Sequence, residues 1–261
     1  MPQNKSRKIG LARALSKLGY CSRSQASELI RAGRVTLNGT TRRDPECPVQ
    51  IERDRIAVEG RVIKAAENVY MMMNKPRGLV TTASDEKGRD TVYSLFTDRA
   101  ESLPWLAPVG RLDKASEGLL LLTNDSEWGA RITAPESHLL KTYHVQIASI
   151  PPREVLESLE RGVRADDGEF LQAVHCRLLR SGRKNCWIEI ALDEGKNRQI
   201  RRMLAALDIA VLRLLRLSIG PLQLGTLRKG AYRSLTSEEK TALDRAMRQS
   251  SGKTLKSDLP T

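Results

Sequence analysis

The stretch VGRLDKASEGLLLLTND, Val109–Asp125, joins a short polar run to a block of four leucines. Arg111 to Glu117 form the polar run, and Leu119–Leu122 form the apolar block. A surface loop before a buried strand is one interpretation of this pattern. The other is that Asp113 is held at the edge of a core because its carboxylate takes part in chemistry.

Composition points to a polyanionic partner. The chain has 261 residues, 40% of them hydrophobic, and a formal net charge of +13. This length allows two modest domains or one large one. Residues 1–66 carry 14 Lys/Arg and 6 Asp/Glu, a net charge of +8. An excess of this kind is typical of a nucleic-acid-binding module or of binding to an acidic membrane surface.

The cysteines and the apolar segments narrow these choices. The four cysteines are scattered without a CxxC pair or zinc-ligand spacing, which is typical of reduced thiols in a cytoplasm. No apolar segment approaches the ~20 residues that span a bilayer, and MPQNKSRKIG lacks the apolar core of a signal peptide. We therefore expect a cytoplasmic protein that binds nucleic acid and no membrane.

The N-terminal quarter predicts two short helices and a hairpin. LARALSKLGY places leucines on one helical face, and Ser22 and Gln25 have capping-box spacing at the start of a second helix. Asn38-Gly39 is a strong signal for a two-residue hairpin turn. Arg23, Arg31 and Arg34 fall on or beside the polar face. Each could be an ordinary solvated arginine, but the regional excess of charge favours binding.

The middle of the chain mixes strands and helices. VYMMMNKPRG predicts a buried strand over residues 69–73 followed by a polar turn over 74–78. KTYHVQIAS alternates, with Lys141 and Tyr143 on one face. Short turns between strands favour an α+β domain with a mixed, largely antiparallel sheet. We expect a binding domain with its linker at 1–66, a catalytic domain at 67–247 and a flexible polar tail at 248–261.

DEGKNRQIRRMLAALD predicts an amphipathic helix. Its apolar residues follow helical spacing, which places Arg198 and Arg202 on the opposite, outward face. Arg201 falls at the boundary between the two faces. An arginine there can bury its stem and direct its guanidinium into a cleft.

Two resemblances join these features. Residues 8–60, through SRSQASELIRAGRVTLNG and DRIAVEG, resemble an S4 RNA-binding domain. From about residue 8 to 235, the chain resembles the RsuA-like family of ribosomal RNA pseudouridine synthases. The motifs that carry this second resemblance are NKPRGLVTT, GRLDKASEGLLLLTND, KTYHVQI, EGKNRQIRRM and LRLLRLSIG.

The family resemblance implies the roles of individual residues. Asp113 is implied as the catalytic aspartate, Tyr143 as the tyrosine that stacks on the base, and Arg201 as the basic partner of the aspartate. Leu214 is implied as an apolar wall of the pocket. Arg111 and Lys75 are candidates for phosphate or base-orienting contacts, with a plain surface role as the alternative. Ser116 stands where Thr is common and keeps the hydroxyl.

The chemistry of pseudouridine formation fits these residue types. The C1′–N1 bond breaks and the uracil rejoins through C5, with no redox change and no external group, so we expect no metal and no cofactor. Asp113 could add to the sugar or the base, or remove the 2′-proton through a glycal; the sequence leaves these routes open. A nearby guanidinium favours the ionised carboxylate.

The sequence leaves two functional hypotheses. The first is an enzyme that acts as a monomer on ribosomal RNA or a ribosome assembly intermediate, with a preference for large-subunit RNA. The second is a non-catalytic S4-domain RNA-binding or ribosome-assembly factor. The presence of both Asp113 and Arg201 favours the enzyme, because a factor without catalysis has no need of the pair.

Overall fold

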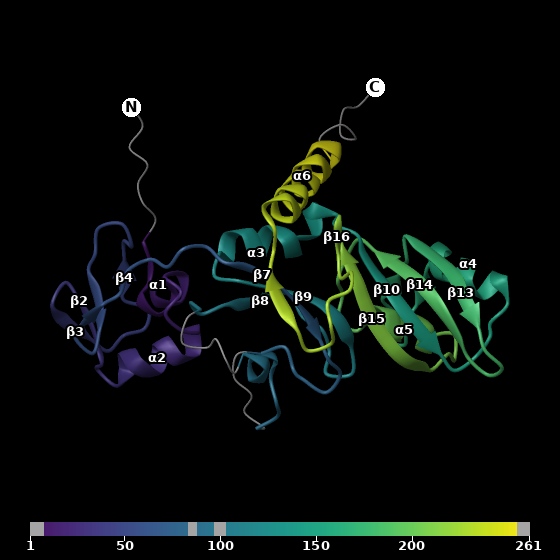
Figure 1. Ribbon diagram of the computed structural model, residues 1–261, viewed down its shortest axis with the longest axis horizontal. Helices are drawn as coiled ribbons and strands as arrows, with labels where there is room; N and C mark the ends of the chain where they lie inside the picture. Colours follow the sequence, from purple (N-terminus) through teal and green to yellow (C-terminus); the bar gives the residue numbers. More distant parts are fainter. Residues whose placement is uncertain (1–7, 83–87, 97–102, 255–261) are drawn as a thin grey trace. The chain divides into compact units, whose positions relative to one another are not determined.

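The computed structural model describes residues 8–82, 88–96 and 103–254. The chain divides into two compact units (Figure 1). The first contains Met1–Tyr70, Phe96–Ala107 and Leu122–Ser126, and the second contains the remainder. Each unit is described by itself.

The N-terminal unit combines two helices with short strands. Helix α1 is Leu11–Lys17 and α2 is Arg23–Arg31. A sheet of order β3-β2-β5-β6 is built from β2 (Val35–Leu37), β3 (Thr40–Arg42), β5 (Ile56–Val58) and β6 (Arg61–Val62). Strand β1 (Ile9–Gly10) pairs separately with β4 (Pro48–Val49). Apolar residues from α1, α2, β2 and β5 form the core of this unit.

Local signals in the sequence correctly predicted how these elements begin and turn. Ser22 and Gln25 form the capping box at the start of α2, each side chain accepting from the other residue's backbone N–H. Asn38 and Gly39 both have positive φ, 54° and 84°, as a tight turn between β2 and β3 requires. The Asn38 side chain also donates to Asp54 at 2.9 Å, which fixes the turn against the next segment.

The second unit is built on one large sheet, whose described residues give nine strands (Figure 1). Its main order is β13-β14-β10-β15-β9-β7-β17, with β16 and β8 attached to β15 and β9. The pairs β10–β14, β10–β15, β13–β14, β15–β16 and β7–β17 are antiparallel, and β9 is parallel to β15, so the predicted α+β class with a largely antiparallel sheet is confirmed. The strands are β7 (Tyr70–Lys75), β8 (Ala107–Val109), β9 (Glu117–Thr123), β10 (Lys141–Ile147), β13 (His175–Ser181), β14 (Cys186–Leu192), β15 (Val211–Ile219), β16 (Leu222–Gln223) and β17 (Tyr232–Ser234).

Helices cover the sheet in two groups. Helices α4 (Arg153–Arg161) and α5 (Gln199–Ala205) share an apolar core with β10, β13, β14 and β15. Helix α3 (Ser126–Thr133) contributes the fully buried Trp128, whose indole N–H donates to Asp244 of α6 (Ser237–Thr254) at 2.9 Å. The short remaining elements are η1 (Val92–Leu95), η2 (Pro135–Ser137), β11 (Val163–Arg164) and β12 (Phe170–Leu171).

Gly118 allows the parallel pairing of β9 with β15. Its φ is +104°, and a Cβ at this position would lie 2.2 Å from the carbonyl oxygen of Arg216 on β15. That distance is far inside van der Waals contact, and the obstacle is backbone, so no side chain fits there. A glycine directly before the four leucines therefore allows β9 to lie against β15.

Two boundaries differ from the prediction. Strand β7 continues to Lys75, whereas the sequence predicted a turn from residue 74; the buried polar side chains at its end find backbone partners and so remain within the sheet. Helix α6 continues to Thr254 instead of ending in a tail at 248, because neither Pro nor Gly occurs before residue 252 to stop it. Residues 255–261 of the predicted tail lie outside the described residues.

Within the described ranges, no helix is both long enough and apolar enough to cross a membrane.

Candidate active site

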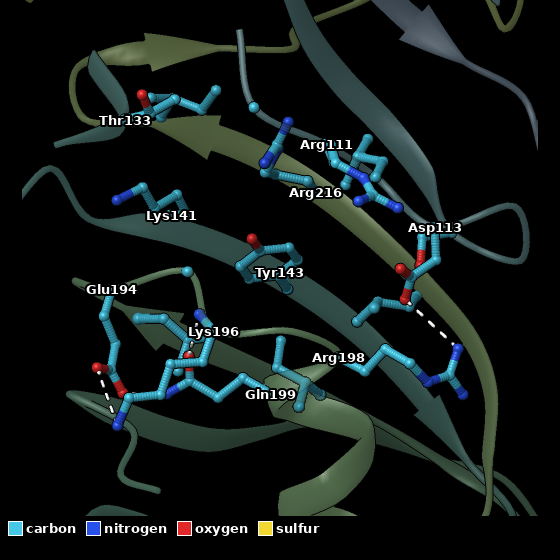
Figure 2. Close-up of a pocket in the computed structure, with 18 of the residues that line it drawn as sticks. Arg111, Asp113, Thr133, Lys141, Tyr143, Glu194, Lys196, Arg198, Gln199 and Arg216 are labelled. Atoms are coloured by element: carbon cyan, nitrogen blue, oxygen red, sulfur yellow. Dashed lines mark hydrogen bonds and ion pairs between the residues drawn. The ribbon is translucent and has the colours of Figure 1, made fainter. Parts of the chain in front are cut away.

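A pocket of about 440 Å³ lies within the second unit (Figure 2). Its walls come from the loop before β9, from β10, from the segment between β14 and α5, and from β15. The sequence-predicted residues Arg111, Asp113, Tyr143, Arg201 and Leu214 all line it. Motifs that lie far apart along the chain are therefore gathered around one cavity.

The loop that carries Asp113 is held by its backbone. The carbonyl groups of Leu112–Ser116 each accept a hydrogen bond. Lys75 Nζ donates to the carbonyls of Asp113, at 3.1 Å, and Ser116, at 2.9 Å. Gly78 N–H donates to the carbonyl of Lys114 at 2.8 Å. With these groups fixed, the backbone that positions the Asp113 carboxylate has little freedom.

Two further donors complete the loop. The Thr81 hydroxyl donates to the Leu112 carbonyl at 2.8 Å and accepts from the Leu112 N–H at 3.3 Å. Arg201 Nη2 donates to the Ala115 carbonyl at 3.2 Å. The NKPRGLVTT segment thus braces the GRLD segment, which explains why both motifs occur in one chain.

Lys75 lies beneath this loop and outside the pocket lining. Its side chain is fully buried, so it cannot meet RNA directly, and the expectation of a phosphate or base contact is wrong for this residue. The error came from ending the strand two residues too early. Burial lowers the pKa of Lys75 to about 8, although Asp113 and Glu117 nearby favour its charged form.

Arg198 makes the ion pair with Asp113. Its Nη1 lies 3.6 Å from Asp113 Oδ2, with 51% of the arginine side chain and 27% of the aspartate side chain exposed (Figure 2). The prediction placed Arg198 on the outward face of a helix. In the structure it precedes the helix, in a left-handed conformation with φ 48°, so helical periodicity does not apply to it.

Arg201 takes its predicted place in the pocket but contacts the loop backbone rather than the carboxylate. Arg201 is half-buried, and this desolvation lowers its pKa. The positive charges of Arg198 and Arg77 lower the pKa further, whereas the negative charge of Asp113 opposes the shift. Arg202, on the following position, turns outward and pairs with Asp167 and Glu169. The boundary position of Arg201 was thus a correct guide to its direction.

The floor of the pocket contains residues that the sequence analysis did not select. Lys141 donates to the Asp193 carbonyl at 3.2 Å, and burial lowers its pKa, with Arg216 contributing. Arg216 is 6% exposed and lies on the same face of the sheet as Tyr143 and Leu214. A signal existed for both residues, because Lys141 and Arg216 each stand two positions from a predicted pocket residue on an alternating strand.

Behind the loop, a buried carboxylate balances two further cations. Glu117 has a side chain only 2% exposed, and it pairs with Arg213 at 3.1 Å and Lys229 at 2.5 Å. Burial alone would favour its neutral form, but these two cations lower its pKa. Glu117 therefore neutralises Arg213 and Lys229 and leaves the cations of the pocket to other partners.

Among the described residues, no group of three or more His, Cys, Asp or Glu side chains could hold a metal ion.

In the N-terminal unit, the three predicted RNA-binding arginines reach solvent. Arg23 and Arg31 stand at the two ends of α2. Arg34 differs from them because its guanidinium pairs with Glu59. We therefore expect Arg23 and Arg31 to offer more of their charge to a polyanion than Arg34 does.

Comparisons with known proteins define the class. The sequence model of the RNA pseudouridylate synthase family matches residues 69–206, and that of the S4 domain matches residues 9–56. The chain belongs to the RNA pseudouridylate synthase family, whose members convert uridine to pseudouridine, and it carries an N-terminal S4 domain. The resemblance inferred from the sequence motifs is confirmed.

Individual relatives agree with this assignment. The ribosomal large subunit pseudouridine synthase B of Bacillus subtilis is 38% identical over 88% of this chain and 93% of its own length. An uncharacterized RNA pseudouridine synthase of Aquifex aeolicus is 35% identical over 92% of this chain and 95% of its own. A crystal structure of a pseudouridylate synthase superposes with a TM-score of 0.62 at 31% identity, covering 90% of this chain and 99% of that one.

Arg201 and Arg198 are expected to differ in importance. Arg201→Met removes a donor to the loop backbone from a half-buried site, so we expect single-turnover rates on saturating RNA to fall about 10- to 100-fold. Arg198→Met removes a half-exposed ion pair and should cost no more than about fivefold. The single-turnover rate of Arg201→Lys should lie between that of Arg201→Met and that of the parent, because lysine keeps the charge but lacks the planar guanidinium.

Arg202→Met serves as the matched control, because Arg202 lies in the same helix and faces outward. A larger loss from Arg198→Met than from Arg201→Met would contradict this ranking.

Lys75 is expected to link activity to pH. As pH rises through about 8, the folded protein loses the Lys75 proton, and the hydrogen bonds to the loop weaken, so the single-turnover rate should fall. Lys75→Met should lower the rate at neutral pH by at least about tenfold and remove this alkaline decline.

The free energy of unfolding should change with pH in the opposite direction to the single-turnover rate. The folded-state pKa of Lys75 lies below its unfolded value of 10.5, so the unfolded chain binds more protons above pH 8, and stability due to Lys75 rises with pH there. Lys75→Met should therefore not lower the melting temperature at pH 7. Lys184→Met, in an exposed turn, is the control. Equal pH–rate profiles for Lys75→Met and the parent would refute the bracing role.

Proposed function

We propose that this chain isomerises one or a few uridines of ribosomal RNA, in the large subunit or one of its assembly intermediates, with Asp113 as the catalytic residue. The observation that carries the proposal is the Asp113 carboxylate on a loop whose five consecutive carbonyls are hydrogen-bonded, facing a pocket floored by Tyr143. The name of the Bacillus subtilis relative supports the choice of RNA.

Each pocket residue has a part in this reaction. The target uridine leaves its stack, at a cost of roughly a few kcal/mol, and Tyr143 returns about 1–3 kcal/mol by stacking on the base. Leu214 closes the pocket beside it. Asp113 acts as nucleophile or as base on the sugar, with Arg198 as the ion-pair partner of its carboxylate. Arg111, exposed at the pocket, is available to an RNA phosphate.

The bond changes balance without another reactant. The C1′–N1 bond breaks, C1′ joins C5, the C5 proton is lost and N1 gains a proton. Asp113 serves all the routes left open by the sequence, because addition and proton removal both require a carboxylate. The rigidity of its loop pre-orients that group and so lowers the entropic part of the barrier.

The N-terminal unit supplies affinity in this proposal. Residues 1–66 carry most of the net positive charge, and Arg23 and Arg31 are placed to meet phosphates. The protein acts as a monomer in the cytoplasm, a compartment that suits its four free cysteines.

Asp113→Asn is expected to abolish isomerisation while preserving folding and RNA affinity, because Asn keeps the shape and loses the charge. The measurement is pseudouridine mapping of total RNA from cells that express the parent, the variant or neither. Asp208→Asn is the control, since Asp208 is exposed and its left-handed backbone suits Asn. If cells that express Asp113→Asn contained pseudouridine at every site that the parent modifies, a different catalytic group would be favoured. If the pseudouridine map were the same with and without the parent protein, the non-catalytic factor would be favoured.

Arg23→Ala with Arg31→Ala is expected to weaken RNA binding and to flatten its salt dependence. Each phosphate interaction that is removed should reduce the slope of log affinity against log salt by about 0.7–0.9. Arg34→Ala is the matched comparison and should change the slope less, because Glu59 already neutralises this arginine. Binding titrations at several salt concentrations measure the slopes. An unchanged slope in the double variant would show that these arginines do not meet RNA.

A further inference from the structure

Arg216 presents an unsatisfied donor at the floor of the pocket. Its Nε donates to the Leu119 carbonyl at 2.8 Å, which anchors the side chain. Its Nη2 is buried and has no hydrogen-bond partner among the described residues. A buried, charged donor left unpaired is costly, and Arg216 is only 6% exposed. Such a group needs an acceptor from outside the chain.

The register of the sheet places this donor beside the stacking tyrosine. Tyr143 on β10 and Arg216 on β15 are directly opposite one another. Side chains of directly opposite residues share a face, with Cβ atoms about 4.5–5.5 Å apart. Both line the pocket, and Figure 2 shows the hydroxyl end of Tyr143 pointing to the side where Arg216 lies. A base that stacks on Tyr143 therefore brings its edge to Arg216.

We propose that Arg216 binds the target base itself, by donating from Nη2 to a carbonyl oxygen of the uracil stacked on Tyr143. The proposal rests on the function above and assigns a substrate contact that the sequence motifs did not. The acceptor enters a pocket that Tyr143 and Leu214 both line, and a group that stacks on Tyr143 is part of a flat ring. A uracil carbonyl fits that description better than a tetrahedral phosphate.

The reaction itself gives this contact a catalytic effect. When the C1′–N1 bond breaks heterolytically, the base keeps the bonding pair, and the charge spreads onto O2 and O4. A fixed guanidinium hydrogen-bonds such an oxygen more strongly than the neutral carbonyl of the intact nucleoside. The contact therefore stabilises the detached base more than the bound substrate, which is the condition for raising the rate.

The symmetry of the base fits a single donor. Rotation of uracil by half a turn about the N3–C6 axis exchanges N1 with C5 and also exchanges O2 with O4. A donor that holds one carbonyl before the turn thus finds the other in the same place afterwards. Arg216 can therefore bind the base before and after the turn without moving its own side chain.

The test combines atomic changes in the RNA with changes in the protein. The RNA is a short fragment around a site that the wild-type chain modifies, with uridine, 2-thiouridine or 4-thiouridine at the target, because sulfur is a weaker hydrogen-bond acceptor. The proteins are the wild type, Arg216→Gln and Arg216→Lys, with Arg228→Gln as a control at an exposed arginine. Single-turnover rates and dissociation constants are measured for each combination.

Arg216→Gln should slow uridine conversion by about 10- to 100-fold, mostly in the single-turnover rate rather than in the dissociation constant. At least one thio substitution should slow the wild type and Arg228→Gln by about tenfold, yet have little further effect on Arg216→Gln. Arg216→Lys should recover part of the rate, and it provides the test if Arg216→Gln fails to fold.

The proposal would be overturned if a thio substitution slowed the wild type and Arg216→Gln by the same factor. A structural or phosphate-binding role for Arg216 predicts that result, because the RNA change and the protein change would then act independently. Full activity of Arg216→Gln would also overturn the proposal. The RNA site is taken from whatever cellular RNA the wild type modifies. A target outside the ribosome would therefore overturn the ribosomal assignment alone and leave this test intact.

Discussion

The ammonium group of Lys75, buried under the loop that carries Asp113, is the contact on which the site depends. It donates to the carbonyls of Asp113 and Ser116, and Gly78, Thr81 and Arg201 hold the carbonyls between and beside them. Burying a charged amine is unfavourable by itself, and the lowered pKa records that cost. The carbonyl dipoles offset it only when the loop keeps one conformation. The same contacts that make the lysine tolerable therefore fix the direction of the Asp113 carboxylate.

Charge around the loop is separated into two layers. Behind it, the buried carboxylate of Glu117 neutralises Arg213 and Lys229, whose side chains are partly exposed. In front of it, Asp113 faces Arg198, with Arg201 and Arg216 nearby, so cations outnumber carboxylates beside Asp113. This excess suits a reaction on a polyanion in which negative charge develops on the base. Gly118 makes the arrangement possible, since only a glycine lets β9 approach the strand that carries Arg213 and Arg216.

Sequence reasoning succeeded where the cause was local. The capping box of α2, the Asn38-Gly39 turn and the alternation of β10 depend on residues within a few positions. It failed where a distant group decided the outcome. Lys75 looked like a turn residue because its acceptors lie about forty positions further along the chain. Arg198 was placed by helical periodicity, although the helix begins one residue later. The pairing of Tyr143 with Arg216 required the strand order, which no local pattern encodes.

The fold also separates the source of affinity from the source of rate. The target base must leave its stack before it enters the pocket, and this unstacking costs free energy. The rigid Asp113 loop cannot rearrange to offset that cost. In the proposed function, phosphate contacts by the basic N-terminal unit provide affinity without acting on the reacting atoms, and they do not distinguish the substrate from the transition state. The site can then keep the desolvated Lys75 beneath the loop and an unpaired Nη2 on Arg216, although both lower stability. In the proposed base contact, the hydrogen bond from Arg216 strengthens as charge develops on the base. If Arg216 binds the base as proposed, it also favours uridine, because a buried donor left without a carbonyl acceptor is penalised more than an exposed one.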